Sequence, residues 1–256
     1  MERVFITGAS SGIGAALALF YASRGARLGL VGRRREALDA LARSLPGEHT
    51  VYVLDVRDRA RLHAAAADFL RRGPVDIVIA SAGISVGTLT EAAEDFPVFQ
   101  AIQETNVLAT VATFEPFIAG MRERGGGRLV GIASVAGVRG LPGAGAYSAS
   151  KAAVKAYCES LRVELHGTGV RVVTISPGFI RTPMTARNPY RMPFLMPVEA
   201  FARSAGRHID RGTRSVVIPW QMGVLAALLR CVPGWAYDRV AAGRKRKPRQ
   251  GSQGTP

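Results

Sequence analysis

The stretch T-G-A-S-S-G-I-G at residues 7–14 ends the apolar run V-F-I-T and opens the helix-forming run A-A-L-A-L-F-Y-A. Glycine lets a backbone approach a pyrophosphate closely, and a helix amino terminus offers unpaired N–H groups and a positive dipole end. The spacing of Gly8, Gly12 and Gly14 is G-x-x-x-G-x-G, not the more familiar G-x-G-x-x-G. It predicts a phosphate-binding turn; a tight strand–helix turn that binds nothing is the alternative.

Short runs rich in Val and Ile alternate with helix-length segments along the rest of the chain. Six of them read as further strands: R-L-G-L-V before Gly32, T-V-Y-V-L before Asp55, V-D-I-V-I-A before Ser81, R-L-V-G-I-A before Ser134, V-R-V-V-T-I before Ser176, and S-V-V-I-P at 215–219. Continuous apolar strands between helices indicate a parallel sheet covered on both faces. We therefore predict an α/β, doubly wound Rossmann fold with a seven-stranded parallel sheet.

The chain reads as one domain followed by two short appendages. Its 256 residues are 48% hydrophobic, enough for a large core, and contain no repeat. We expect a single catalytic domain with a cofactor site over 1–220 and an apolar helical extension over 221–243. The end, G-R-K-R-K-P-R-Q-G-S-Q-G-T-P, is basic and poor in apolar residues. Such a composition predicts a disordered tail over 244–256.

Ligands of such a sheet bind beyond the carboxyl ends of the strands. Most of the unusual residues of this chain stand at such ends: Gly8 to Gly14, Gly32 to Arg34, Asp55, Ser81 to Gly83, Ser134, and Pro177 to Thr182. We expect them to share one site.

Tyr147 and Lys151 stand four residues apart in A-Y-S-A-S-K, and lysine is rare in this chain. Residues at i and i+4 share a helix face, so the ammonium can lie near the phenol. A neighbouring cation favours phenolate, which predicts that the pKa of Tyr147 is lowered. Tyr147 is then a candidate general acid or base near neutral pH. A surface helix with an ordinary Tyr and Lys is the alternative.

The second strand ends in L-V-G-R-R-R, which bears on the choice of cofactor. An NAD site usually has an acid here for the ribose 2′-hydroxyl, whereas an Arg accommodates the 2′-phosphate of NADP. This chain has Gly32 followed by Arg33 and Arg34, and Ser10 or Ser11 can add a hydroxyl donor. The pattern predicts a preference for NADP(H).

Together these motifs make the chain resemble the classical short-chain dehydrogenase/reductase family from about Arg3 to Thr182. The resemblance rests on T-G-A-S-S-G-I-G, Asp55 in L-D-V, Ala82-Gly83, Asn106 in E-T-N-V, Ser134 in I-A-S, Tyr147 with Lys151, and P-G-F-I-R-T at 177–182. One departure is Ser81, where the family commonly has Asn. Serine can make some of the same hydrogen bonds but is shorter, so the departure bears on the stabilisation of the sheet end and not on the catalytic assignment.

The resemblance implies roles for individual residues. Those matching Ser134, Tyr147 and Lys151 are catalytic in the family, and the one matching Asn106 completes a tetrad by anchoring a water chain to the lysine. Tyr147 would transfer the hydroxyl proton, and Lys151 would also bind the nicotinamide ribose. Asp55 would contact the adenine and Thr182 the nicotinamide end. The full implied cofactor set is Gly8, Ser10, Ser11, Gly12, Ile13, Gly14, Arg33, Arg34, Asp55, Val56, Ser81, Ala82, Gly83, Tyr147, Lys151, Pro177, Gly178, Ile180 and Thr182.

The charge of the chain invites other functions. Net charge is +15 and the sequence pI is about 11.0. The sequence does not predict a nucleic-acid partner, because the 34 basic residues include only 4 lysines, the arginines are spread along the chain, and no recognition motif is present. An anionic cofactor or membrane surface suits the charge better. The scattered histidines, His49, His63, His166 and His208, predict no metal site.

Cellular location is predicted from what the sequence carries at its start and from its cysteines. Cys158 and Cys231 form no disulfide framework, which favours a reducing compartment. The amino terminus has no apolar signal-peptide region, and no apolar stretch reaches the length of a spanning helix. We expect a cytoplasmic protein, with peripheral membrane contact as a further possibility.

Substrate choice in this family depends on the segment after P-G-F-I-R-T. Here its apolar residues are Met184, Tyr190, Met192, Phe194, Leu195 and Met196. They favour a lipid-like, steroid-like or aromatic carbonyl over a sugar, although they could simply pack a lid shut. Three prolines in the segment favour a loop over a long helix.

The apolar run from Val224 to Leu229 is flanked by Trp220 and Trp235 and is too short to span a bilayer. Burial against the body or a partner subunit is one reading, since family members are usually dimers or tetramers. A membrane-surface helix held by the R-K-R-K cluster is the other.

Taken together, the motifs predict an NADP(H)-dependent oxidoreductase acting on carbonyls and secondary alcohols. The alternative is a non-catalytic dinucleotide-binding regulator or scaffold.

Overall fold

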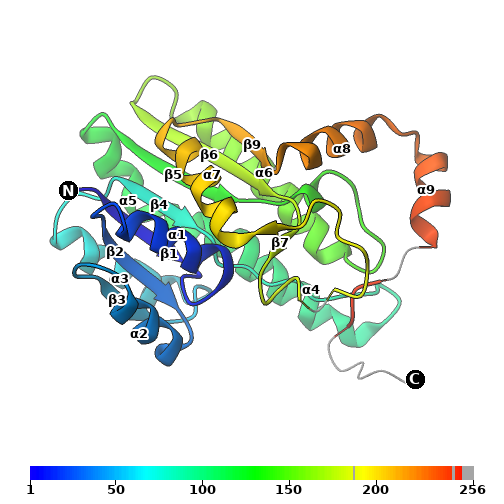
Figure 1. The fold of residues 1–256 in the computed structure, drawn as a ribbon, viewed down its shortest axis with the longest axis horizontal. Coiled ribbons are helices and arrows are strands. Elements are labelled where there is room, and N and C mark those ends of the chain that lie inside the picture. The colour runs from blue at the N-terminus through cyan, green and yellow to red at the C-terminus, as the bar shows by residue number, and fades with distance from the viewer. Residues whose placement is uncertain (187, 244–245, 250–256) are drawn as a thin grey trace.

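A parallel sheet forms the centre of the computed structural model, which describes residues 1–186, 188–243 and 246–249 (Figure 1). Within these residues the sheet has seven strands in the order β3-β2-β1-β4-β5-β6-β9, every neighbouring pair parallel. The strands are β1 (Arg3–Thr7), β2 (Arg27–Gly32), β3 (Thr50–Val53), β4 (Ile77–Ala80), β5 (Gly127–Ile132), β6 (Val170–Pro177) and β9 (Ser215–Ile218). The predicted doubly wound sheet is confirmed.

Helices cover both faces of the sheet, so every central strand is apolar on both sides. Side chains of α1 (Gly12–Ala22), α2 (Arg35–Ser44) and α7 (Val198–Asp210) fill one core. Side chains of α3 (Arg59–Arg71), α5 (Ala109–Glu123) and α6 (Gly145–Glu164) fill the other. The buried strands β1 and β4 contribute alternate residues to the two cores, as their pleat requires.

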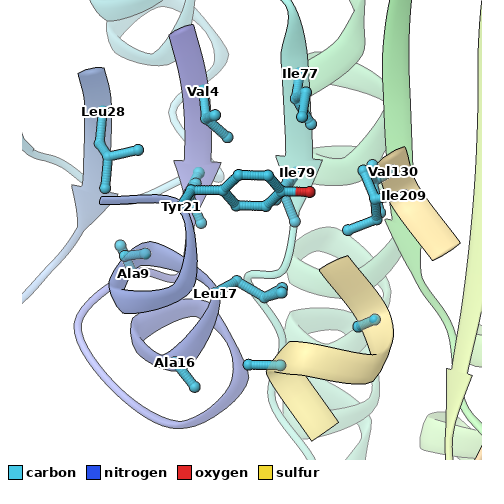
Figure 2. Close-up of a cluster of buried hydrophobic side chains, with 14 of the residues drawn as sticks. Val4, Ala9, Ala16, Leu17, Tyr21, Leu28, Ile77, Ile79, Val130 and Ile209 are labelled. Atoms are coloured by element: carbon cyan, nitrogen blue, oxygen red, sulfur yellow. The ribbon is translucent and has the colours of Figure 1, made fainter. Parts of the chain in front are cut away.

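Figure 2 shows the core on the α1 side, where the ring of Tyr21 lies across β1 and β4. Leu17 on α1 and Ile209 on α7 pack beside it, and all three side chains are fully buried. The Tyr21 hydroxyl donates to Asp210 at 3.4 Å, and burial raises the pKa of this phenol. Burying an apolar side chain such as Leu17 or Ile209 stabilises the fold by roughly 1.5–3 kcal/mol.

The chain reverses its direction across the sheet between β1 and β4. From β1 it winds through β2 to β3 at one edge, then returns to β4 on the other side of β1. The loops after β1 and β4 therefore leave in opposite directions, and a crevice opens between them at the carboxyl ends of the strands. This crevice is where the sequence predicted the site.

The remaining elements are additional to the seven-stranded sheet and the six helices that cover it. They are η1 (Ala93–Asp95), α4 (Phe96–Gln103), the π-helical turn η2 (Glu104–Leu108), η3 (Val135–Gly137), β7 (Ile180–Arg181), β8 (Met196–Pro197), α8 (Trp220–Cys231) and α9 (Gly234–Ala242). Residue 187, in the segment between β7 and β8, lies outside the described residues. The described part of this segment contains no long helix, as its prolines predicted. The predicted apolar helix after β9 is α8. Among the described residues, no helix is long and apolar enough to cross a membrane.

The carboxyl-terminal segment departs from the prediction. Residues 244–245 and 250–256 lie outside the described residues, but 246–249 do not form the disordered chain that their composition suggested. This segment, red in Figure 1, lies near α4. Arg249 binds Asp95 and Glu94 there, both at 2.7 Å. Composition could not predict this docking, because the acidic partners stand more than 150 residues earlier in the chain.

Candidate active site

A cavity of about 970 Å³ opens at the carboxyl ends of the strands. It is lined by every residue of the implied cofactor set, and also by Ser134. The sequence-predicted residues therefore lie together, although they come from segments that follow six different strands. Asn106 is the exception: it does not line the cavity and is fully buried behind it.

The glycine turn after β1 is shaped by two close approaches of backbone. Gly8 has φ of 70°, and a Cβ there would stand 2.7 Å from the Ala82 backbone nitrogen. A Cβ at Gly14 would collide with the Gly8 carbonyl oxygen. The turn is thus closed on the protein side, while its outer side faces the cavity at the start of α1. This is the cradle that a pyrophosphate requires.

The end of β2 carries a cluster of donors. The Arg34 guanidinium donates to the Ser10 carbonyl at 3.0 Å and to the Ser10 hydroxyl at 3.2 Å. A Cβ at Gly32 would stand 3.3 Å from the same hydroxyl, so the missing side chain leaves room for Ser10. Arg33 lies 3.8 Å from Asp55. Two guanidinium groups and a hydroxyl therefore lie together at this end of the cavity, with no acid at position 32.

Asp55 follows β3 and is held by a bidentate pair with Arg57, whose guanidinium donates at 2.7 and 3.1 Å. The Arg57 hydrogen bond is the main reason that the pKa of this carboxyl lies below its usual value. The carboxylate is therefore ionised and fixed at the edge of the cavity, where the resemblance places the adenine.

Ser134, Tyr147 and Lys151 form a second cluster in the middle of the cavity. Ser134 follows β5, and its hydroxyl accepts from the Ala136 N–H at 3.1 Å. Tyr147 lies in the first turn of α6 and forms a hydrogen bond with Ser134. One helical turn later, buried Lys151 places its Nζ 5.8 Å from the Tyr147 ring centre and donates to the Ile132 carbonyl at 2.8 Å. Serine and tyrosine hydroxyls thus converge on one point, where a carbonyl oxygen can accept from both.

The predicted direction of the Tyr147 pKa is wrong. Burial raises the pKa of this phenol, the Ser134 hydrogen bond lowers it by less, and Lys151 is not among the causes. Burial also lowers the pKa of Lys151 to about 8, so its ammonium is charged at neutral pH. That ammonium donates to the Ile132 carbonyl, which explains why helical spacing alone misjudged its effect on the phenol. A raised pKa keeps Tyr147 protonated, which is the form that can donate to a carbonyl.

Asn106 lies in the π-helical turn η2, an irregularity that is frequent at functional sites. Its Oδ1 accepts from the Ile84 N–H at 2.8 Å, and its Nδ2 donates to the Ser150 hydroxyl at 2.9 Å and the Ile84 carbonyl at 3.0 Å. It therefore ties the loop after β4 to α6. A Cβ at Gly83 would stand 3.2 Å from Asn106 Oδ1 and 3.6 Å from Lys151 Nζ, so Asn106 and Lys151 border the same backbone.

Sequence reasoning missed part of the cavity wall. Ser85 lines it, and so do Lys247, Pro248 and Arg249 from the carboxyl-terminal segment. Lys247 donates to the Ser85 hydroxyl at 2.7 Å, and its Nζ lies 5.9 Å from the Tyr147 ring centre. The scarcity of lysine, with Lys247 one of only four, was the one signal in the sequence that could have drawn attention to it.

Comparison with known proteins agrees with this geometry. A family model described as short chain dehydrogenase matches residues 2–191. An "Uncharacterized oxidoreductase" of Myxococcus xanthus is 41% identical over 244 residues, which cover 94% of this chain and 96% of that protein. The chain therefore belongs to the short-chain dehydrogenase/reductase family, of the classical type. Its members are oxidoreductases that bind a nicotinamide dinucleotide.

Solved structures share the fold along most of their length. A short-chain dehydrogenase from Streptomyces avermitilis superposes with a TM-score of 0.79 at 27% identity, covering 94% of this chain and 98% of that one. A 3-oxoacyl-[acyl-carrier protein] reductase from Brucella melitensis with bound NAD superposes with a TM-score of 0.74 at 27% identity, covering 85% and 89%. The chain thus spans nearly the whole length of these relatives.

Proposed function

We propose that this short-chain dehydrogenase/reductase interconverts a carbonyl and a secondary alcohol with NADP(H). The observation that carries the proposal is the convergence of Ser134, Tyr147 and Lys151 in one cavity with the glycine turn after β1. A non-catalytic binding protein needs the turn but has no use for a buried lysine beside a serine–tyrosine pair. A bound nicotinamide dinucleotide supplies the hydride.

The chain's own residues supply position and the proton. In reduction, the hydroxyls of Ser134 and Tyr147 would donate to the substrate oxygen and stabilise the charge that develops on it. Tyr147 would then release its proton to the alkoxide, and in oxidation it would take the proton back. Lys151 would donate to the cofactor ribose. Asn106 would keep the loop after β4 and the first turns of α6 in register, so that these donors stay aligned.

The Arg33, Arg34 and Ser10 cluster supports NADP(H) over NAD(H), because only the phosphorylated ribose offers an anionic partner to the guanidinium groups. The bound NAD of the Brucella relative belongs to that protein. Apolar residues that border the cavity mouth, such as Met184, support a substrate with an apolar body. We also propose a cytoplasmic homo-oligomer; the free cysteines Cys158 and Cys231 support a reducing compartment.

The test is turnover by Tyr147→Phe, which removes only the transferable proton. With wild-type protein, NADPH oxidation in the presence of a panel of ketones and aldehydes should be observed. The variant should lose about 10²- to 10⁴-fold in kcat, the usual contribution of a proton-transfer residue, while binding NADPH within about threefold. Tyr157→Phe on the same helix should behave as wild type.

Two outcomes would contradict the proposal. Retention of most activity by Tyr147→Phe would show that the proton comes from elsewhere. Tight NADPH binding by the wild type without turnover of any carbonyl or alcohol would favour the non-catalytic binding protein.

A further inference from the structure

The segment 246–249 crosses the mouth of the cavity and is fixed there at several points. The Gly87 N–H donates to the Pro248 carbonyl at 2.9 Å, and Gly87 and Arg249 form a parallel bridge. A side chain at Gly87 would collide with the Lys247 carbonyl. Arg249 also binds Asp95, which is buried and in turn accepts from the Leu89 N–H at 2.8 Å. The segment therefore belongs to the cavity wall.

This docking brings Lys247 next to the proposed proton donor. Its Nζ lies 5.9 Å from the Tyr147 ring centre, a distance close to the 5.8 Å of Lys151. The two lysines have different surroundings: Lys151 is buried and borders Gly83 of the proposed cofactor loop, whereas Lys247 reaches Tyr147 from the docked segment at the mouth. A ligand that enters the cavity through that mouth meets Lys247 as it reaches Tyr147.

The ammonium of Lys247 has unused capacity. It donates to the Ser85 hydroxyl at 2.7 Å, and within residues 1–186, 188–243 and 246–249 no carboxylate pairs with it. An ammonium has three N–H donors, so two remain for a ligand. Burial lowers the pKa of Lys247 to about 8, which leaves it charged at neutral pH. By contrast, the neighbouring cation Arg249 is neutralised by Asp95 and Glu94.

We infer that Lys247 is a specificity-determining residue that binds an anionic oxygen group, carboxylate or phosphate, a few bonds from the reacting carbonyl. This inference rests on the proposed function and narrows its substrate to apolar carbonyl compounds that carry such a group. The anion replaces or joins Ser85 as the partner of the ammonium, while the carbonyl oxygen lies at Ser134 and Tyr147. A half-buried cation without a counter-charge gains most from a ligand that supplies one.

The experiment compares matched substrates in the full-length wild type and in Lys247→Met. Benzoylpropionate and its neutral methyl ester form one pair. Phenacyl phosphate and neutral α-methoxyacetophenone, in which a methoxy group replaces the phosphate, form the other. The wild type should prefer the anion in at least one pair, and which pair shows it distinguishes carboxylate from phosphate. Lys247→Met should lose about 10- to 100-fold in kcat/KM on that anion, which is the usual size of the loss of a hydrogen bond to a charged group. The loss should come mainly from a higher KM. The neutral partner should change less than about threefold.

Two further variants separate charge from structure. Lys247→Arg should recover most of the preference for the anion. Arg246→Met removes an exposed basic residue beside Lys247 and should change neither substrate more than about twofold. An equal loss on anionic and neutral partners, or no preference in a wild type that reduces the neutral ketones, would overturn the inference while leaving the proposed function intact. A wild type that reduces none of the four would contradict the proposed function and this inference with it.

Discussion

Gly32 shows at the scale of one residue how a missing side chain shapes the cofactor end of the cavity. The space that an aspartate would need is taken by Ser10, whose hydroxyl would lie 3.3 Å from a Cβ at position 32. Arg34 then reaches Ser10 from the next loop. Because the guanidinium uses only part of its donor fork on Ser10, it can also bind a phosphate. The proposed NADP preference would thus depend on Ser10, Arg33 and Arg34.

Removing the Arg34 guanidinium should therefore weaken NADPH binding selectively. We expect Arg34→Ala to cost roughly 1–3 kcal/mol in NADPH affinity, the scale of a charge-assisted hydrogen bond, and to change NADH affinity little. The difference should shrink at high salt, because the contact is electrostatic. Arg35→Ala, at the exposed start of α2 and outside the cavity, is the matched control. Fluorescence titration with both cofactors measures the effect; equal wild-type affinities for NADPH and NADH would refute the preference.

Lys151 makes the second residue-scale prediction, on pH. Burial lowers its pKa from 10.5 to about 8, so its ammonium is lost as the pH rises through about 8. NADPH affinity should fall roughly tenfold between pH 7 and pH 9 in the wild type, following the charged fraction. The profile should be flat in Lys151→Met. Lys155→Met on the same helix, outside the cavity, should keep the wild-type profile.

The lowered pKa of Lys151 makes stability respond to pH in the opposite direction to NADPH affinity. Between pH 8 and 10.5 the unfolded chain binds more protons at Lys151 than the folded chain, so this residue's contribution to the unfolding free energy rises with pH in that window. Lys151→Met should consequently be no less stable than the wild type at pH 7, although we expect it to lose activity. A clear loss of stability would mean that its hydrogen bond to Ile132 outweighs the cost of burying the charge.

At the scale of elements, the strand–turn–helix unit β1–α1 was readable in the sequence because each part has its own local signal. Val and Ile runs specify buried strands, and glycines at fixed offsets specify the turn between them. Gly14 is confined by the Gly8 carbonyl, a backbone group that cannot rotate away. Gly120 on α5, in contrast, has open space around its missing Cβ. The two helical glycines thus differ in the space around them.

The same substitution at these two positions should therefore have opposite effects. Gly14→Ala should lower the unfolding free energy by about 1–3 kcal/mol through overpacking and should abolish tight NADPH binding. Gly120→Ala should raise it by about 0.5–1 kcal/mol, because alanine is the better helix former, with NADPH binding unchanged. Urea denaturation followed by tryptophan fluorescence measures both. A stabilising Gly14→Ala would mean that the turn does not have the close backbone approach described above.

The features that the sequence could not predict all depend on contacts between elements that are far apart in the chain. Helical spacing placed Lys151 beside Tyr147, but the pKa of the phenol is governed by burial, which spacing does not reveal. Composition marked the carboxyl end as disordered, but Arg249 finds Asp95 across the cavity mouth. The cavity itself was predictable, since strand ends converge in any parallel sheet; its outer wall was not.

At the scale of the whole molecule, the helices α8 and α9 carry an exposed apolar face. Figure 1 shows α8 and α9 projecting beyond β9, far from α1. Trp220 and Trp235 are both 70% exposed there, and Leu228 is 62% exposed. The predicted burial of this apolar run against the body is therefore incomplete within one chain. α8 and α9 are anchored on their inner side by Arg139, which donates to the Leu229 and Val232 carbonyls, and by the Tyr237 hydroxyl on the Gly140 carbonyl at 2.6 Å.

This exposed face leads to the last prediction, that two copies of the chain bury α8 and α9 against each other. Members of the family commonly oligomerise, and a fixed apolar face is suited to a stable contact. The wild type should sediment as a dimer or tetramer at micromolar concentration, and the double variant Trp220→Ser, Leu228→Ser should sediment as a smaller species with the same fold by circular dichroism. Leu19→Ser, which changes an exposed apolar residue on α1, should leave the oligomer intact. Co-sedimentation with anionic vesicles tests the competing membrane reading: binding by a monomeric wild type at low salt, lost in the double variant, would assign this face to a lipid surface instead.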